Sequence, residues 1–365
     1  MVVLAPAANG RTYERTYGRT FGRTNRHTYR YTASNHGLSL MAVFTPVTEN
    51  QARTLLQDYD LGTLESLTGI SAGIENTNYF LDTDRGRFVL TIFEVLTQEQ
   101  LPFYVELMHH LASRGVPVPM PQTRRDGTRM ALFDGKPAII VSKLPGQWVK
   151  QPTTAHCELA ATTMAQMHLA ARDFESEQPN LRALPWWQAT APKLTEFLDA
   201  AQNDMLRKAL DEQTELSASG ELDSLPKGPA HCDFFRDNVL FTGAADEPVM
   251  GGVIDFYFAG CDHWLFDIAV AVNDWCIDRD SGALLRPLVQ AWLAAYQTVR
   301  PLTEQERALW PAMLRAAALR FWISRLYDYH RPRPAETLTP HDPVHFERIL
   351  RLRMTEPVPE IMETM

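Results

Sequence analysis

The stretch HCDFFRDNVLF (231–241), followed after a short loop by GVIDF (252–256), decides the fold and points to the function. We predict strands over 238–242 and 249–256, joined by turn residues at 243–247. Asp233 lies in the loop before the first strand, Asn238 where that strand begins, and Asp255 at the end of its partner. Because one strand of a hairpin begins where its partner ends, we expect these three side chains to converge.

Each of the three residues alone also fits an ordinary turn, and only their conjunction favours a functional site. Oxygen ligands from Asn238 and Asp255 suit Mg²⁺, which combines carboxylates with phosphate oxygens and retains waters. Asp233, left without a metal, could accept a proton from an attacking hydroxyl.

The rest of the chain divides into a β-rich part and a helical part. Residues 46–142 predict a mostly antiparallel sheet with one inserted helix, which begins near Pro102. The strands of this sheet are expected at 77–82, 87–94, 129–133 and 137–142. A connector near 143–146 follows. Beyond it we predict helices at 155–171, 186–208, 265–278, 282–299, 303–330 and 343–353, and a loop over 212–229. We therefore expect an α+β fold with lobes at 41–143 and 144–365.

Composition excludes several classes of protein. The chain has 365 residues and a net charge of -9, which argues against a globally basic nucleic-acid binder. Its apolar runs are too short to cross a bilayer, so no membrane association is expected. The four cysteines show no C-x-x-C spacing, and we expect reduced thiols in a cytoplasmic protein.

Residues 1–40 differ from the rest, with six arginines and one glutamate, which leaves a net charge of -14 in 41–365. This Arg/Thr/Tyr-rich segment lacks apolar periodicity, so we predict a disordered extension. A transit-type peptide, a basic arm that touches nucleic acid or lipid, and non-native sequence upstream of Met41 remain open. We favour the last.

The pattern H-x-D-x-x-x-x-N followed by I-D-F resembles the catalytic signature of the aminoglycoside-phosphotransferase-like (choline kinase-like) family, whose members are relatives of the protein kinases. The closer resemblance is to the homoserine kinases of this family, on MAVFT (41–45) and on 73–80, 87–94, 101–121, 252–276 and 319–328. It implies a bilobal protein-kinase-like fold. It also implies ATP-dependent phosphorylation of L-homoserine to O-phospho-L-homoserine, a step of threonine biosynthesis, with ATP and Mg²⁺.

The resemblance also implies roles for individual residues. Asp233 matches the catalytic base, and Asn238 and Asp255 match the Mg²⁺ ligands. His231 and Asp267 match residues that support the catalytic loop. The implied ATP contacts lie in the turn that covers the phosphates (Ser71, Gly73, Asn76, Asn78) and in the connector beside adenine (Ser142, Leu144).

Three departures from the family pattern stand out. Thr91 occupies a position where related kinases often carry a lysine, so Glu106 lacks the usual partner. Cys232 stands where many relatives have glycine. Arg236 could face the transferring phosphate, or could pair with Asp237 or Asp262.

The acceptor site is less defined. Arg320 and Arg325, on the apolar helix 303–330, could bind an amino-acid carboxylate or pair with Asp328 or Asp274. We expect His168 to be a packed histidine, and Trp186-Trp187 to serve packing rather than capture of a quaternary ammonium.

Alternative functions are a same-fold kinase for choline, ethanolamine or an aminoglycoside, and a non-catalytic nucleotide-binding module. Thr91 favours the module slightly, whereas the intact set of Asp233, Asn238 and Asp255 opposes it. A metallohydrolase built on 231–233 is disfavoured, because consecutive residues of an extended segment point to different sides.

Overall fold

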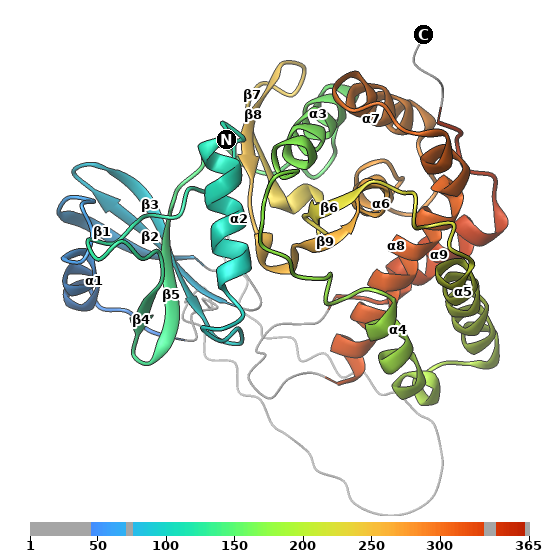
Figure 1. Cartoon of the computed structure of the whole chain (residues 1–365), viewed down its shortest axis with the longest axis horizontal. Coiled ribbons are helices and arrows are strands. Elements are labelled where there is room, and N and C mark those ends of the chain that lie inside the picture. Colours follow the sequence, from blue (N-terminus) through green and yellow to red (C-terminus); the bar gives the residue numbers. More distant parts are fainter. Residues whose placement is uncertain (1–44, 71–75, 332–340, 362–365) are drawn as a thin grey trace, which may run out of the picture. The chain divides into compact units, whose positions relative to one another are not determined.

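Five antiparallel strands form the N-terminal sheet in the order β1-β2-β3-β5-β4 (Figure 1). The structure is a computed structural model and describes residues 45–70, 76–331 and 341–361. The strands are β1 (Leu64–Ile70), β2 (Asn76–Thr83), β3 (Gly86–Phe93), β4 (Ala131–Phe133) and β5 (Lys136–Ser142). Every second residue of β2 is buried, as expected for a strand with one face on a core.

Two helices pack with this sheet. Helix α1 (Glu49–Leu56) begins at a capping box of Thr48 and Gln51, and its Leu55 and Leu56 join Leu81 and Leu90 in a core under the sheet. Helix α2 (Pro102–Ser113) instead buries its apolar residues in the larger core that also holds the C-terminal helices. The sheet and the helical part therefore share packing through α2.

The C-terminal part is mostly helical around the buried helix α6 (Trp264–Trp275), all of whose residues are buried. Its other helices are α3 (Thr154–Ala170), α4 (Leu184–Thr190), α5 (Ala200–Ser219), α7 (Arg286–Val299), α8 (Glu304–His330) and α9 (Val344–Thr355). Two antiparallel strand pairs complete it, β6 (Lys227–Ala230) with β9 (Gly260–His263) and β7 (Val239–Gly243) with β8 (Pro248–Val253). The expected α+β architecture is confirmed.

The connector after β5 lies against β7 and β8. The backbones of Gln147 and Phe241 exchange hydrogen bonds of 2.9 and 2.8 Å. At Gly252, with φ of 138°, a Cβ would lie 2.4 Å from the carbonyl oxygen of Pro117 and 2.6 Å from Leu144. Only glycine fits there, and this close contact fixes the chain three residues before Asp255.

Two helix predictions are wrong in extent. Helix α5 continues to Ser219, where a loop was expected over 212–229, because Gln213 is buried and donates to the carbonyl oxygen of Ala312. The helix expected over 186–208 is interrupted between α4 and α5, where Asp199 caps a new helix. Among the described residues, no helix is both long and apolar enough to cross a membrane.

Candidate active site

The loop between β6 and β7 brings the predicted catalytic residues together. The side-chain amide of Asn238 donates to the backbone oxygen of Asp233 at 2.9 Å and to its Oδ2 at 3.3 Å. The N–H of Ile254 donates to the backbone oxygen of Asn238 at 2.9 Å. The residue before Asp255 is therefore tied to Asn238 through the backbone.

The backbone is strained on both sides of this cluster. Cys232 (φ 60°) and Asp255 (φ 65°) adopt the left-handed conformation, which among the described non-glycine residues is otherwise seen only at Asp134. This conformation costs an L-residue roughly 1–2 kcal/mol. It explains why glycine suits the position of Cys232, and such strain is typical of functional sites.

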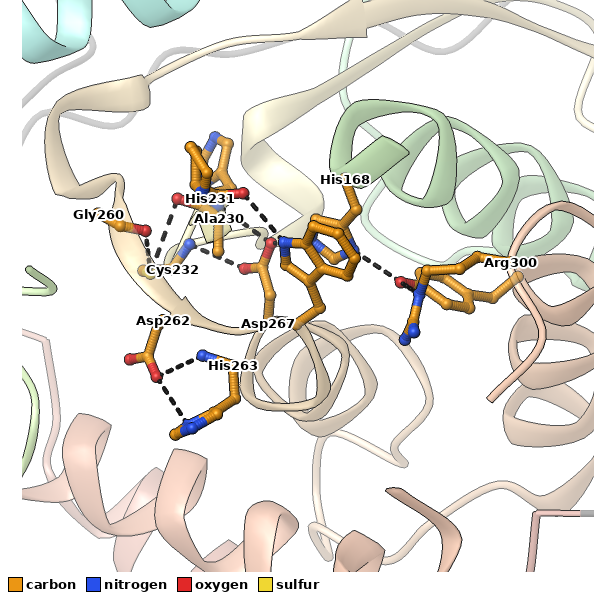
Figure 2. Close-up of polar contacts among 12 residues, drawn as sticks. His168, Ala230, His231, Cys232, Gly260, Asp262, His263, Asp267 and Arg300 are labelled. Atoms are coloured by element: carbon orange, nitrogen blue, oxygen red, sulfur yellow. Dashed lines mark hydrogen bonds and ion pairs between the residues drawn. The ribbon is translucent and has the colours of Figure 1, made fainter. Parts of the chain in front are cut away.

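The carboxylate of Asp267 holds the strained loop in place (Figure 2). It is fully buried and accepts the backbone N–H groups of His231 (3.0 Å) and Cys232 (2.8 Å). Burial alone would raise the pKa of Asp267, but its hydrogen bond with His168 and its N–H donors hold the pKa below its ordinary value. This is the supporting position that the resemblance implies for Asp267.

A buried chain of hydrogen bonds continues from Asp267 into the helices, and it is not apparent in the sequence. His168 Nε2 lies 3.0 Å from Asp267 Oδ2, and His168 Nδ1 lies 2.7 Å from the hydroxyl of Tyr296. Arg300 Nε donates to the same hydroxyl at 2.6 Å and its guanidinium pairs with Glu306. Burial lowers the pKa of His168, so its neutral ring donates from Nε2 and accepts at Nδ1.

His231 and Arg236 have structural partners. His231 is buried, and its Nε2 lies 2.9 Å from the backbone oxygen of Ile254, which braces the loop against the chain that leads to Asp255. Arg236 is also buried; its Nε and its backbone N–H both donate to Asp274 Oδ2 at 2.9 Å. The expectation that Arg236 faces a phosphate or pairs with Asp237 or Asp262 is wrong, because its side chain turns into the core toward the end of α6.

On the nucleotide side, Thr91 at the usual lysine position lies opposite Asn78 and donates to its Oδ1 at 2.8 Å. Glu106 pairs with Arg129 instead, at 2.9 Å to each carboxylate oxygen. Asn76 begins β2, while Ser71 and Gly73 lie outside the described residues.

In the connector, the hydroxyl of Ser142 accepts the backbone N–H of Met120, and the backbone N–H of Ser142 donates to the oxygen of Met120. Leu144 packs against Gly252. The side chain of Ser142 therefore ties the connector to the preceding loop.

Two arginines of α8 approach the catalytic loop. Arg320 Nη1 lies 3.9 Å from Asp233 Oδ1, so Arg320 pairs with Asp233 rather than with Asp328 or Asp274. The guanidinium of Arg325 lies 4.5 Å from the ring centre of Phe346. Burial raises the pKa of Asp233, and the positive charge of Arg320 opposes the rise most strongly.

The tryptophan pair serves packing. Trp187 is buried and donates to the backbone oxygen of Arg182. The Arg182 guanidinium lies 4.4 Å from the ring centre of Trp186, which thus contacts a cation of the chain itself.

Comparison with known proteins decides the family, because the model of the phosphotransferase enzyme family matches residues 66–302. The chain belongs to the phosphotransferase enzyme family. A homoserine kinase of Paraburkholderia phymatum is 56% identical over 318 residues, covering 86% of this chain and 98% of that one. A homoserine kinase of Paraburkholderia xenovorans is 54% identical over 319 residues, covering 86% of this chain and 96% of the other. The matched region of the phosphotransferase model contains Asp233, Asn238 and Asp255.

Solved structures of the same fold are kinases of small molecules. An amicoumacin kinase has a TM-score of 0.60 at 14% identity, covering 83% of this chain and 91% of its own. A microcompartment-associated aminopropanol kinase has a TM-score of 0.59 at 18% identity, covering 84% and 94%. The expected kinase-like fold is therefore confirmed.

Proposed function

We propose that the protein transfers the terminal phosphoryl group of ATP to the side-chain hydroxyl of L-homoserine, which forms O-phospho-L-homoserine for threonine biosynthesis. The observation that carries this proposal is the tethering of Asp233 to Asn238 and of Asn238 to the chain before Asp255. The assignment of L-homoserine as the substrate rests on relatives named homoserine kinase, which are 53–56% identical to this chain over almost their whole length.

Asp233 acts as the base in this proposal. Its carboxylate is mostly buried, and Asn238 fixes its orientation. A carboxylate so placed can accept a hydrogen bond from the acceptor hydroxyl, orient the oxygen for in-line attack and take up its proton. Burial raises the pKa of Asp233 above its ordinary value, which makes its carboxylate a stronger base.

Asn238 and Asp255 would hold Mg²⁺. One carboxylate and one amide oxygen fit this ion, which takes its remaining ligands from water and from the ATP phosphates. When bound, Mg²⁺ neutralises charge on the phosphates. Among the described residues, no three His, Cys, Asp or Glu side chains form a cluster that could hold a metal ion. We therefore expect Mg²⁺ to bind together with the ATP phosphates.

ATP would lie between the sheet and the connector. We assign the phosphates to the turn of Ser71 and Gly73 with Asn76 and Asn78, and adenine to the backbone at Ser142 and Leu144. Ser142 and Lys143 already donate their N–H groups to Met120 and Arg87. No acceptor for the Leu144 N–H is found among the described residues, so Leu144 is the better donor to adenine.

An acceptor panel tests the proposal. Purified protein with MgATP is given L-homoserine, choline, ethanolamine or an aminoglycoside, and ADP release is measured. Turnover with L-homoserine and not with the amines is expected. Turnover only with an amine would overturn the substrate, and ATP binding without any turnover would favour a nucleotide-binding module.

A further inference from the structure

Arg320 differs from the other buried arginines of the described chain. Arg236, Arg300 and Arg353 each donate hydrogen bonds, to Asp274, Glu306 and Asn273 respectively. Arg320 is equally buried, with 3% of its surface exposed, yet its guanidinium makes no hydrogen bond to any described residue and its Nε is buried without a partner. Arg236, by contrast, leaves only Nη2 without a partner. Buried guanidinium groups are normally satisfied, so an unsatisfied one needs an explanation.

The counter-charge of Arg320 does not supply the missing hydrogen bonds. Asp233 Oδ1 is 3.9 Å from Arg320 Nη1, which is beyond hydrogen-bond distance. Asp328 also attracts Arg320, but it is exposed and its influence is smaller. The guanidinium is held 3.7 Å from the ring centre of Phe321. Arg320 is thus fixed in place beside the catalytic carboxylate with donor capacity left over.

A second cation, Arg182, lies near the same aromatic ring as Arg320. The guanidinium groups of Arg320 and Arg182 lie 5.4 and 6.0 Å from the ring centre of Phe258, three residues after Asp255. Arg182 also lies over Trp186, one of the two rings considered above for capture of a quaternary ammonium. The two arginines repel each other, so a bound anion would relieve an unfavourable contact, whereas a cationic acceptor would increase it.

We propose that Arg320 binds the carboxylate of the acceptor, so that Asp233 and Arg320 hold the hydroxyl and carboxylate ends of one hydroxy amino acid. A guanidinium binds a carboxylate through two parallel hydrogen bonds, which matches the unused donors of Arg320. This inference rests on the proposed kinase function and adds a physical reason to expect that carboxylate-free amino alcohols are poor acceptors.

The test compares two acceptors that differ only at the carboxylate. L-Homoserinol carries a hydroxymethyl group where L-homoserine carries the carboxylate. The wild-type protein should favour L-homoserine in kcat/KM by roughly 10²-fold, the size of a lost charge-assisted interaction. At a pH above the acid limb of the profile, Arg320→Gln should lower kcat/KM for L-homoserine by a similar factor, mainly through KM, and should change kcat/KM for L-homoserinol less than about threefold.

Arg315→Gln is the matched control. This variant removes a charge from the same helix, where Arg315 pairs with Glu212. It should leave kcat/KM unchanged for both acceptors. If Arg320→Gln does not fold, Arg320→Lys replaces it, since lysine keeps the charge but loses the bidentate geometry. In that variant kcat/KM should fall roughly tenfold for L-homoserine and should not fall for L-homoserinol.

Two results would overturn the inference while the kinase function stands: equal wild-type kcat/KM for the two acceptors, or an equal loss for both acceptors in the Arg320 variant. Failure of the wild-type protein to phosphorylate L-homoserine would overturn the proposed function instead.

Discussion

His168 lies 3.0 Å from Asp267 through Nε2 and Oδ2, with both side chains inaccessible to solvent. The two residues come from α3 and α6. The same carboxylate accepts the N–H groups of His231 and Cys232. Packing between two helices therefore determines where the loop carrying Asp233 lies, which connects the buried core to the proposed chemistry.

Asp267→Asn should weaken both stability and turnover. An amide has one acceptor oxygen for three donors and turns N–H groups toward them. We expect a loss of about 3 kcal/mol in the free energy of unfolding and a fall in kcat on the order of 10²-fold as the loop shifts. Urea unfolding and steady-state kinetics measure these, with the exposed Asp246→Asn as control. Unchanged kcat would show that the loop holds its position without Asp267.

Protonation of His168 should limit stability in acid. Burial lowers the pKa of His168 in the folded protein, while the unfolded residue titrates near ~6.5. Below that pH the unfolded state binds a proton that the folded state does not, so stability falls as the pH decreases. In His168→Gln the fall in stability below pH ~6.5 should be shallower than in the wild type, which urea unfolding at a series of pH values measures. Parallel curves for the two proteins would contradict a neutral buried His168.

Glu106→Gln should have little effect. The Glu106–Arg129 ion pair is partly exposed, and such pairs contribute about 0–1 kcal/mol. Since Thr91 offers no cation, we expect kcat within about twofold of wild type. Steady-state kinetics with MgATP measure this. A tenfold or larger loss would mean that Glu106 orders a phosphate-binding cation after all.

The pH profile of kcat/KM should report Asp233. Activity should rise with pH as this carboxyl loses its proton. Arg320 lowers the pKa of Asp233, so Arg320→Gln should raise that pKa and move the acid limb to higher pH. Arg320→Lys and Arg315→Gln should leave the limb in place. Asp237, whose pKa is raised to about 6, needs its own control, because a limb that disappears in Asp237→Asn would belong to that residue.

The sequence predicted those features that local geometry determines. Asn238 and Asp255 flank one hairpin, so the pairing of β7 with β8 brings their chain segments together. The partners of long charged side chains were not predictable, because they depend on how helices distant in sequence pack. Arg236 reaches Asp274 and His168 reaches Asp267 for this reason.

The extent of α5 shows the same limit. The residues near 212–220 include serines and a glycine that are also common in loops, and only the burial of Gln213 against α8 makes the helix favourable. The unsatisfied state of Arg320 likewise has no signal in the sequence. Its position on an apolar helix was visible, whereas its missing hydrogen bonds appear only in the structure.

The proposed role of Asp233 in phosphoryl transfer is tested by comparing wild-type protein with Asp233→Asn. Both proteins are given L-homoserine and MgATP, and ATP binding is measured in parallel. Formation of O-phospho-L-homoserine and ADP can be followed by phosphorus NMR. We predict stoichiometric products from the wild type. In the variant we predict a loss in kcat of roughly 10²–10⁴-fold with ATP binding retained, as expected for removal of a general base. Equal turnover by the two proteins would contradict the central claim.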